Sequence, residues 1–67
     1  MANLSELKDI INDSGMTMVA IAEKSGIVRE TLYNRLDGKG EFSASEIVGL
    51  TKTLHLTRKD RDRIFLS

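Results

Sequence analysis

Five polar side chains that can recognise the edge of a DNA base pair lie within six consecutive residues, 29–34. Arg29 can donate two hydrogen bonds to guanine O6 and N7, and Asn34 can pair with adenine N6 and N7. The carboxylate of Glu30 can accept from cytosine N4, while Thr31 and Tyr33 can contact a thymine methyl or a phosphate. The pattern indicates base recognition if one element exposes these side chains together. Ordinary surface charges for Arg29 and Glu30, and packing of Tyr33 on the domain edge, are the alternatives.

Other kinds of chemistry lack the residues that they need. The chain has no cysteine and a single histidine, His55. A thiolate metal site is therefore excluded, and no serine–histidine–carboxylate set is indicated. The glycine-rich loop at 37–41 has the wrong spacing for a phosphate-binding loop and follows no strand. We expect no enzyme activity, no metal, no cofactor and no small-molecule substrate.

The residues that can read bases belong to the second of two short helices predicted at 18–25 and 28–36. Gly26 stands between them, where a chain leaving a helix commonly takes a left-handed conformation. In the second helix Leu32 and Leu36 share one face by their i, i+4 spacing. This spacing predicts that the leucines pack in the core while the polar side chains face a partner.

Apolar periodicity and capping signals predict an all-α chain with helices near 4–13, 18–25, 28–36, 44–54 and 58–65. The expected N-cap residues are Asn3, Thr17, Ser43 and Thr57. A glutamate three positions on predicts a capping box at Asn3 and Ser43, and Asp60 has the corresponding position after Thr57. The core is expected to hold the inward-facing apolar residues Leu7, Ile10, Ile11, Ile21, Ala22, Ile27, Leu32, Leu36, Ile47, Leu50 and Leu54.

Length and composition fit a single domain over residues 1–67. No apolar run is long enough for a membrane span and the N-terminus has no signal-peptide pattern, so we expect a cytoplasmic protein without a membrane partner. Ten basic and ten acidic residues cancel, whereas DNA-binding proteins usually carry a basic excess. Residues 35–67 nevertheless hold seven of the basic and five of the acidic side chains. The balance lowers the expected non-specific affinity for DNA without excluding DNA.

The run AEKSGIVRETLYNRLDG, at 22–38, resembles the helix-turn-helix of the phage repressor and Cro-type family of transcriptional regulators. The continuation GKGEFSASEIVGLTKTLHL, at 38–56, resembles more narrowly the small repressors of phages and mobile elements in Gram-positive bacteria. The resemblance covers roughly residues 4–66. It implies a five-helix lambda-repressor-like fold, a helix-turn-helix at 17–36, and a sequence-specific regulator that binds double-stranded DNA as a homodimer on a palindromic operator.

The resemblance also implies roles for individual residues. It implies that bases are read by Arg29, Glu30, Tyr33 and Asn34, in a recognition helix at 28–36. Contacts to the DNA backbone fall to Thr17, Val28, Thr31, Arg35 and Lys39. Two departures weaken the expected affinity: Val28 replaces the usual serine or threonine cap, and Met18 replaces a glutamine that often donates to a phosphate.

Two further expectations concern proteins as partners. Leu56, Phe65 and Leu66 are apolar residues left over at the C-terminal end, so they are predicted to form the dimer contact. A different class of function is a helix-turn-helix scaffold used as a protein–protein interaction module that binds another regulator. The zero net charge and the two departures favour that alternative, whereas Arg29, Asn34, Arg35 and Lys39 at the expected positions favour DNA.

Overall fold

The computed structural model describes residues 2–66, which contain five α-helices and no strand. The helices are α1 (Leu4–Asp13), α2 (Met18–Ser25), α3 (Arg29–Leu36), α4 (Ala44–Thr53) and α5 (Arg58–Phe65). The predicted all-α class is confirmed, and the predicted bounds differ by one residue at two ends. α3 begins at Arg29 because Val28 is extended, with φ −60° and ψ 133°, and α4 ends at Thr53 because Leu54 is its C-cap.

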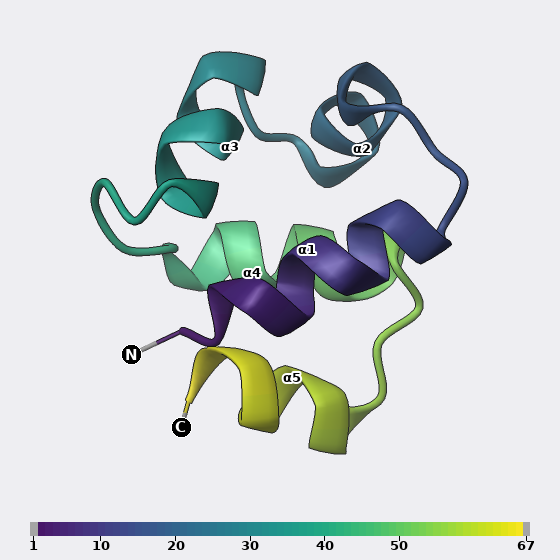
Figure 1. Ribbon diagram of the computed structural model, residues 1–67, viewed down its shortest axis with the longest axis vertical. Coiled ribbons are helices and arrows are strands. Elements are labelled where there is room, and N and C mark those ends of the chain that lie inside the picture. Colours follow the sequence, from purple (N-terminus) through teal and green to yellow (C-terminus); the bar gives the residue numbers. More distant parts are fainter. Residues whose placement is uncertain (1, 67) are drawn as a thin grey trace.

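The helices form a small globule with α2 and α3 at one end and α5 at the other (Figure 1). α2 packs against both α3 and α4, and α5 packs against α1 and α4. The two ends of the described chain meet on one side, where the amide of Asn3 donates to the carbonyl of Ile64 at 2.6 Å. α3 is thus supported from behind and leaves its other side at the molecular surface.

Each helix contributes one fully buried residue to the core, and these are Leu7, Ile21, Leu32, Leu50 and Ile64. Eight of the expected core residues are buried, while Ile10, Ile47 and Leu54 are partly buried and pack against the core. Ile64 and Phe65 were missing from the expected core. Their helix has a strongly charged sequence that gives little apolar periodicity, so its buried side became visible only in the packing.

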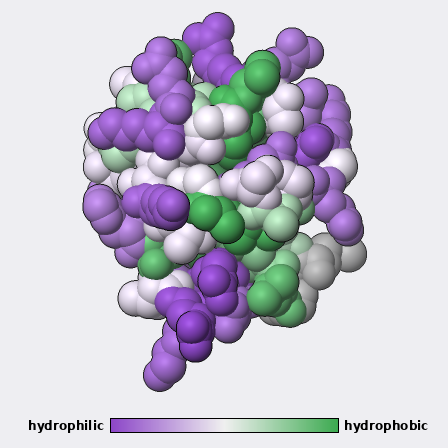
Figure 2. Space-filling model, turned by 180° about the vertical axis from the view of Figure 1, so that it is seen from behind, coloured by the Kyte–Doolittle hydropathy of each residue, from purple (hydrophilic) through white to green (hydrophobic). Residues whose placement is uncertain are grey.

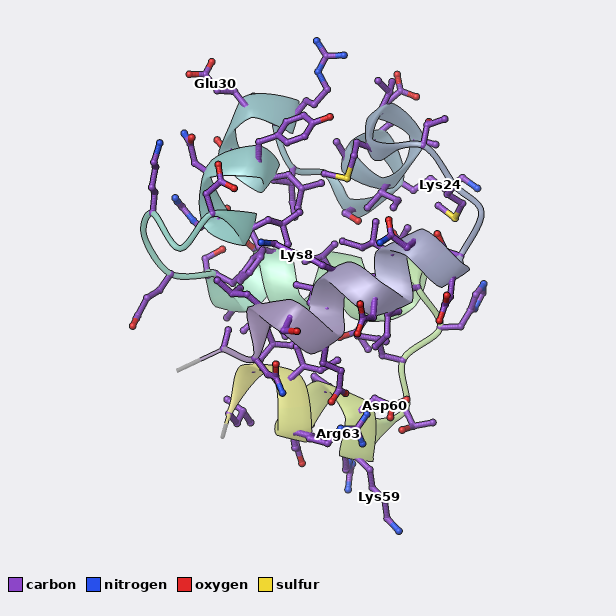
Figure 3. The ribbon with its side chains drawn as sticks, viewed as in Figure 1. Lys8, Lys24, Glu30, Lys59, Asp60 and Arg63 are labelled. Atoms are coloured by element: carbon purple, nitrogen blue, oxygen red, sulfur yellow. The ribbon has the colours of Figure 1, made fainter. Side chains whose placement is uncertain are left out.

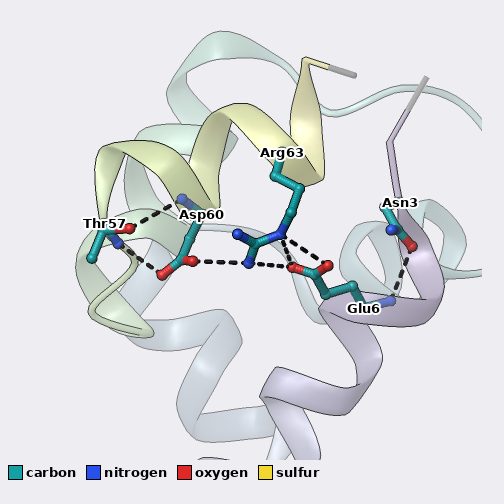
Figure 4. Close-up of polar contacts among 5 residues, drawn as sticks. All are labelled: Asn3, Glu6, Thr57, Asp60 and Arg63. Carbon is teal, nitrogen blue, oxygen red and sulfur yellow. Dashed lines mark hydrogen bonds and ion pairs between the residues drawn. The ribbon is translucent and has the colours of Figure 1, made fainter.

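Four helices begin with a side-chain cap, as predicted. The side chains of Asn3, Thr17, Ser43 and Thr57 each accept from the amide three residues further on. The capping boxes of α4 and α5 are complete, with Glu46 accepting from the amide of Ser43 and Asp60 from that of Thr57. The box predicted at Asn3 is wrong in one half, because Glu6 accepts from Arg63 of α5 at 2.7 and 3.0 Å instead (Figure 4).

A close contact between helix backbones fixes α2 against α4. A Cβ atom added at Gly49 would overlap the carbonyl oxygen of Ser25. Nearby, the hydroxyl of Ser25 donates to that of Thr53 at 3.0 Å. Glycine therefore allows α4 to approach the end of α2, and this approach sets the position of the turn that leads into α3.

Candidate nucleic-acid interface

The turn between α2 and α3 decides which side of α3 faces outward. Gly26 has φ +72° and ends α2 in the left-handed conformation, as the sequence predicted. The amide of Ile27 then donates to the carbonyl of Ala22 at 3.0 Å, and the Ile27 side chain enters the core. Because side chains alternate along extended backbone, Val28 points away from the core and is 70% exposed.

α3 has a buried side and an exposed side. Leu32 and Leu36 are buried, which confirms the predicted inward face. The residues on the other side line one shallow depression, and they are Val28, Arg29, Glu30, Tyr33 and Asn34. Glu30 extends away from the body of the molecule (Figure 3). All four residues expected to read bases are therefore on one accessible surface, which we call the α3 surface.

The α3 surface mixes hydrogen-bonding and apolar groups. Arg29 and Glu30 are exposed at the first turn, and Tyr33 is 48% exposed one turn later. Val28 makes no side-chain cap, as expected, so the first amides of α3 have no side-chain acceptor from the residue that precedes the helix. Donors, an acceptor and apolar carbon lie close together, which is the combination that base edges and a thymine methyl require.

Three of the residues expected to contact the DNA backbone differ in their exposure and in the element that carries them. Thr17 is exposed at the start of α2, where its oxygen accepts from the amide of Ala20 at 3.1 Å. Thr31 is partly buried on α3, whereas Lys39 is exposed in the loop that follows this helix. A helix N-terminus such as that of α2 favours an anion because of its unpaired amides and its dipole.

Arg35, the remaining residue expected to contact the DNA backbone, is bonded to the protein's own loop. Its Nη1 donates to the carbonyl of Lys39 at 3.0 Å, and its Nε lies 3.7 Å from Oε1 of Glu46. The guanidinium also lies over Gly40. The only sequence signal for this arrangement is an arginine one turn before a loop that contains two glycines.

Several of the charged side chains form ion pairs with one another. Within residues 2–66, the ion pairs involve three arginines and four carboxylates, namely Arg35, Arg61, Arg63, Glu6, Glu46, Asp60 and Asp62. None of these pairs includes Arg29 or Lys39. Glu30 and Asp37 lie in the same region, so the α3 surface is not a basic patch.

The ion-pair cluster of α1 and α5 lies at the end of the molecule away from α3 (Figures 3 and 4). Arg63 joins Glu6 to Asp60, with 2.8 Å between its Nη2 and the Asp60 carboxylate. The pKa of Asp60 is lowered, first by the backbone amide of Thr57 and then by Arg63. The pKa of Arg63 is raised by Glu6 and Asp60. This cluster joins two helices and is not connected with the α3 surface.

The predicted dimer contact needs correction. Phe65 is only 7% exposed and packs edge-on against Phe42, with 5.4 Å between ring centroids. It therefore belongs to the core and is not available to a second protomer. Leu56 is partly buried against the core, and only Leu66, at 68%, is largely exposed. Figure 2 shows one face of the molecule, on which apolar residues reach the surface in small areas between polar ones.

Comparisons with known proteins identify no relative. A scan against protein-family models, a search of curated proteins and a search of solved structures gave no match. In the part of the chain that the structure describes, no group of three or more histidine, cysteine or acidic residues could hold a metal ion. Over the same residues, no helix has both the length and the apolar character needed to span a membrane.

Proposed function

We propose that this protein is a sequence-specific DNA-binding regulator of the phage repressor or Cro type, with a lambda-repressor-like fold. In this proposal α2, the turn at 26–28 and α3 are the helix-turn-helix. The observation that carries it is the division of α3 into a side that buries Leu32 and Leu36 and a side on which Arg29, Glu30 and Tyr33 are exposed and Asn34 is partly exposed. Those exposed residue types are the ones that hydrogen-bond to base edges.

In the proposed complex α3 enters the major groove with its N-terminal end foremost. Arg29 donates to guanine O6 and N7, Asn34 pairs with adenine, and Glu30 accepts from cytosine N4. Tyr33, one turn along, contacts a thymine methyl or a phosphate. Because Glu30 is repelled by phosphates, its place on this surface favours a role in reading bases over a role in general attraction to DNA.

Contacts to the backbone would flank α3 and set its register. The N-terminus of α2, with Thr17, supplies one phosphate contact, and the loop that carries Lys39 supplies another. Val28 and Thr31 stand near the first turn of α3, where an apolar or hydroxyl side chain can approach the sugar–phosphate chain. Arg35 is left out of this set, because its guanidinium is bonded to the protein's own loop.

The proposal includes a homodimer that represses transcription from a palindromic operator. One such domain makes only a few base contacts, and two domains would reach half-sites roughly 34 Å apart, one helical turn of DNA. With Phe65 in the core, Leu66 is the main exposed apolar residue at the predicted contact. Leu56 can add the part of its side chain that the core does not cover.

Selection of binding sites from randomised duplexes tests the proposal, followed by mobility shifts on the selected and scrambled DNA at several salt concentrations. We expect the selected duplex to bind at least about a thousandfold more tightly than scrambled DNA, as specific regulators do. Equal affinity for both duplexes, or no binding even at low salt, would contradict a sequence-specific regulator.

A protein–protein module is the second candidate. Val28 and Tyr33 are exposed on the same surface, and the zero net charge gives little general attraction to DNA. In this alternative the α3 surface packs against another regulator, and Tyr33→Ala abolishes that complex while the wild type binds no duplex at low salt. The two candidates therefore differ in whether the wild type binds DNA. A DNA-binding regulator binds duplexes with an affinity that falls as the salt concentration rises, whereas the protein–protein module does not bind them.

A further inference from the structure

The loop after α3 is bonded to the last turn of that helix at two residues. The amide of Gly38, whose φ is +84°, donates to the carbonyl of Arg35 at 3.1 Å and so ends the helix. Lys39 makes the other bonds. The Lys39 amide donates to the carbonyl of Asn34 at 2.8 Å. Its carbonyl accepts from Nη1 of Arg35 at 3.0 Å. Both sides of the Lys39 Cα are therefore attached to neighbouring residues of α3. As a result, the direction in which the Lys39 side chain leaves the backbone is fixed relative to the α3 surface.

Gly40 provides the space that this arrangement needs. Its φ of +88° lies in the left-handed region, and a Cβ atom there would lie 2.7 Å from Nη1 and 3.2 Å from Cζ of Arg35. Real Cβ atoms do not approach other heavy atoms as closely as 2.7 Å, so any larger residue would displace the guanidinium. The loop is thus shaped around the Arg35 side chain.

Glu46 extends the same contact to α4. Its Oε1 accepts from the amide of Ser43 at 2.8 Å and lies 3.7 Å from Nε of Arg35. The side chains of Arg35 and Glu46 are 27% and 18% exposed, so both are largely shielded from water. The guanidinium therefore lies between the loop carbonyl and the capping box of α4, with its Nε near Glu46 but not hydrogen-bonded to it.

We propose that Arg35 is a positioning residue that clamps the loop and presents the Lys39 ammonium to a phosphate beside the groove that α3 reads. The inference rests on the proposed DNA-binding function and assigns Arg35 no phosphate contact of its own. Nη1 of Arg35 donates to the carbonyl of Lys39, and in the proposed complex only the Lys39 ammonium contacts the phosphate. Loss of Arg35 should therefore act through Lys39.

A double-mutant cycle between Arg35→Gln and Lys39→Ala tests this mechanism, because coupled residues give losses that do not add. Each single variant should weaken operator binding roughly tenfold, the effect of one lost charge-assisted hydrogen bond. Lys39→Ala should lower the salt slope of binding by about one. The double variant should bind like Lys39→Ala alone, with a slope lower than that of the wild type by about one and not by two.

Two further variants provide controls. Gly40→Ala keeps every charge but displaces the guanidinium and strains the loop backbone, whose φ of +88° disfavours a Cβ. It should therefore weaken binding at least as much as Arg35→Gln does and add little to Lys39→Ala. Lys59→Gln removes a positive charge at the far end of the molecule (Figure 3), and it should leave both affinity and salt slope unchanged. Circular dichroism establishes that each variant is folded.

Amide exchange gives a measurement that does not depend on DNA. The Lys39 amide should exchange faster in Arg35→Gln and Gly40→Ala than in the wild type, because freeing the Lys39 carbonyl loosens the residue whose amide bonds to Asn34. The Gly38 amide, which donates to the Arg35 carbonyl of the backbone, is the internal reference and should change less. A double-variant slope lower by about two would make Arg35 a direct phosphate contact and overturn the proposal. So would an unchanged exchange rate at Lys39. If the wild type prefers no DNA sequence, the proposed function fails, and the exchange rates still decide whether the clamp exists.

Discussion

Arg29 is exposed at the first turn of α3, beside Glu30, and takes part in none of the ion pairs found within residues 2–66. If it reads a guanine with two hydrogen bonds, Arg29→Ala should cost about 1–3 kcal/mol on the cognate site and relax the preference at that base pair. Competition binding with each of the four base pairs at that position measures both effects. Equal losses on operator and scrambled DNA would make Arg29 a backbone contact.

Phe65 and Leu66 are adjacent apolar residues with different surroundings. Because Phe65 is buried against Phe42 while Leu66 is 68% exposed, Phe65→Ala should destabilise the fold by about 3–5 kcal/mol. Leu66→Ser should leave the melting temperature nearly unchanged at a protein concentration low enough for the chain to be monomeric. Thermal unfolding of both variants checks this contrast. A large loss of stability in Leu66→Ser would show that its side chain is covered.

The contact between α2 and α4 depends on Gly49. Alanine is favoured over glycine in a helix by about 1 kcal/mol, yet the added Cβ would overlap the Ser25 carbonyl oxygen. The steric effect should dominate, because both atoms belong to helix backbones that cannot move independently. Gly49→Ala should therefore destabilise the protein by about 1–3 kcal/mol in chemical denaturation. Val48→Ala, at the adjacent exposed position, is the control and should change little.

The turn between α4 and α5 contains a residue that the sequence did not mark as unusual. His55 has φ +55°, and the following residue, Leu56, donates from its amide to the carbonyl of Thr51 at 2.9 Å. A side chain in this left-handed conformation costs about 1 kcal/mol. His55→Gly should therefore raise the melting temperature by a few degrees. His55→Ala keeps a Cβ and should give no increase, and an equal gain in both variants would rule out the backbone explanation.

At the scale of the whole molecule, Asp60 and Arg63 connect α5 to Glu6 of α1. The pKa of Asp60 is lower in the folded state, so its ionised form stabilises the fold above the unfolded pKa of about 3.9. That stabilisation is lost as the pH falls through the folded pKa. We expect the melting temperature of the wild type to exceed that of Asp60→Asn at neutral pH, and the difference to shrink below about pH 4. A difference that stayed constant down to pH 2 would contradict the assignment.

The sequence by itself determined the helices and the two sides of α3. N-caps, the Gly26 stop and the spacing of Leu32 and Leu36 each involve residues within four positions of one another, so local rules were sufficient. The same spacing placed the expected base-reading residues on the opposite side, and the structure brings them together on one surface.

Only the tertiary structure decided which partner each long or apolar side chain takes. Glu6 bonds to Arg63, 57 positions away, in place of its own helix start, and Phe65 meets Phe42 in the core. Arg35 turns toward a loop that Gly40 leaves open. Charged and apolar side chains have several possible partners of similar energy, and the packing of distant helices selects among them. The sequence therefore predicted which residues can form such contacts, whereas the fold decided toward which partner each side chain points.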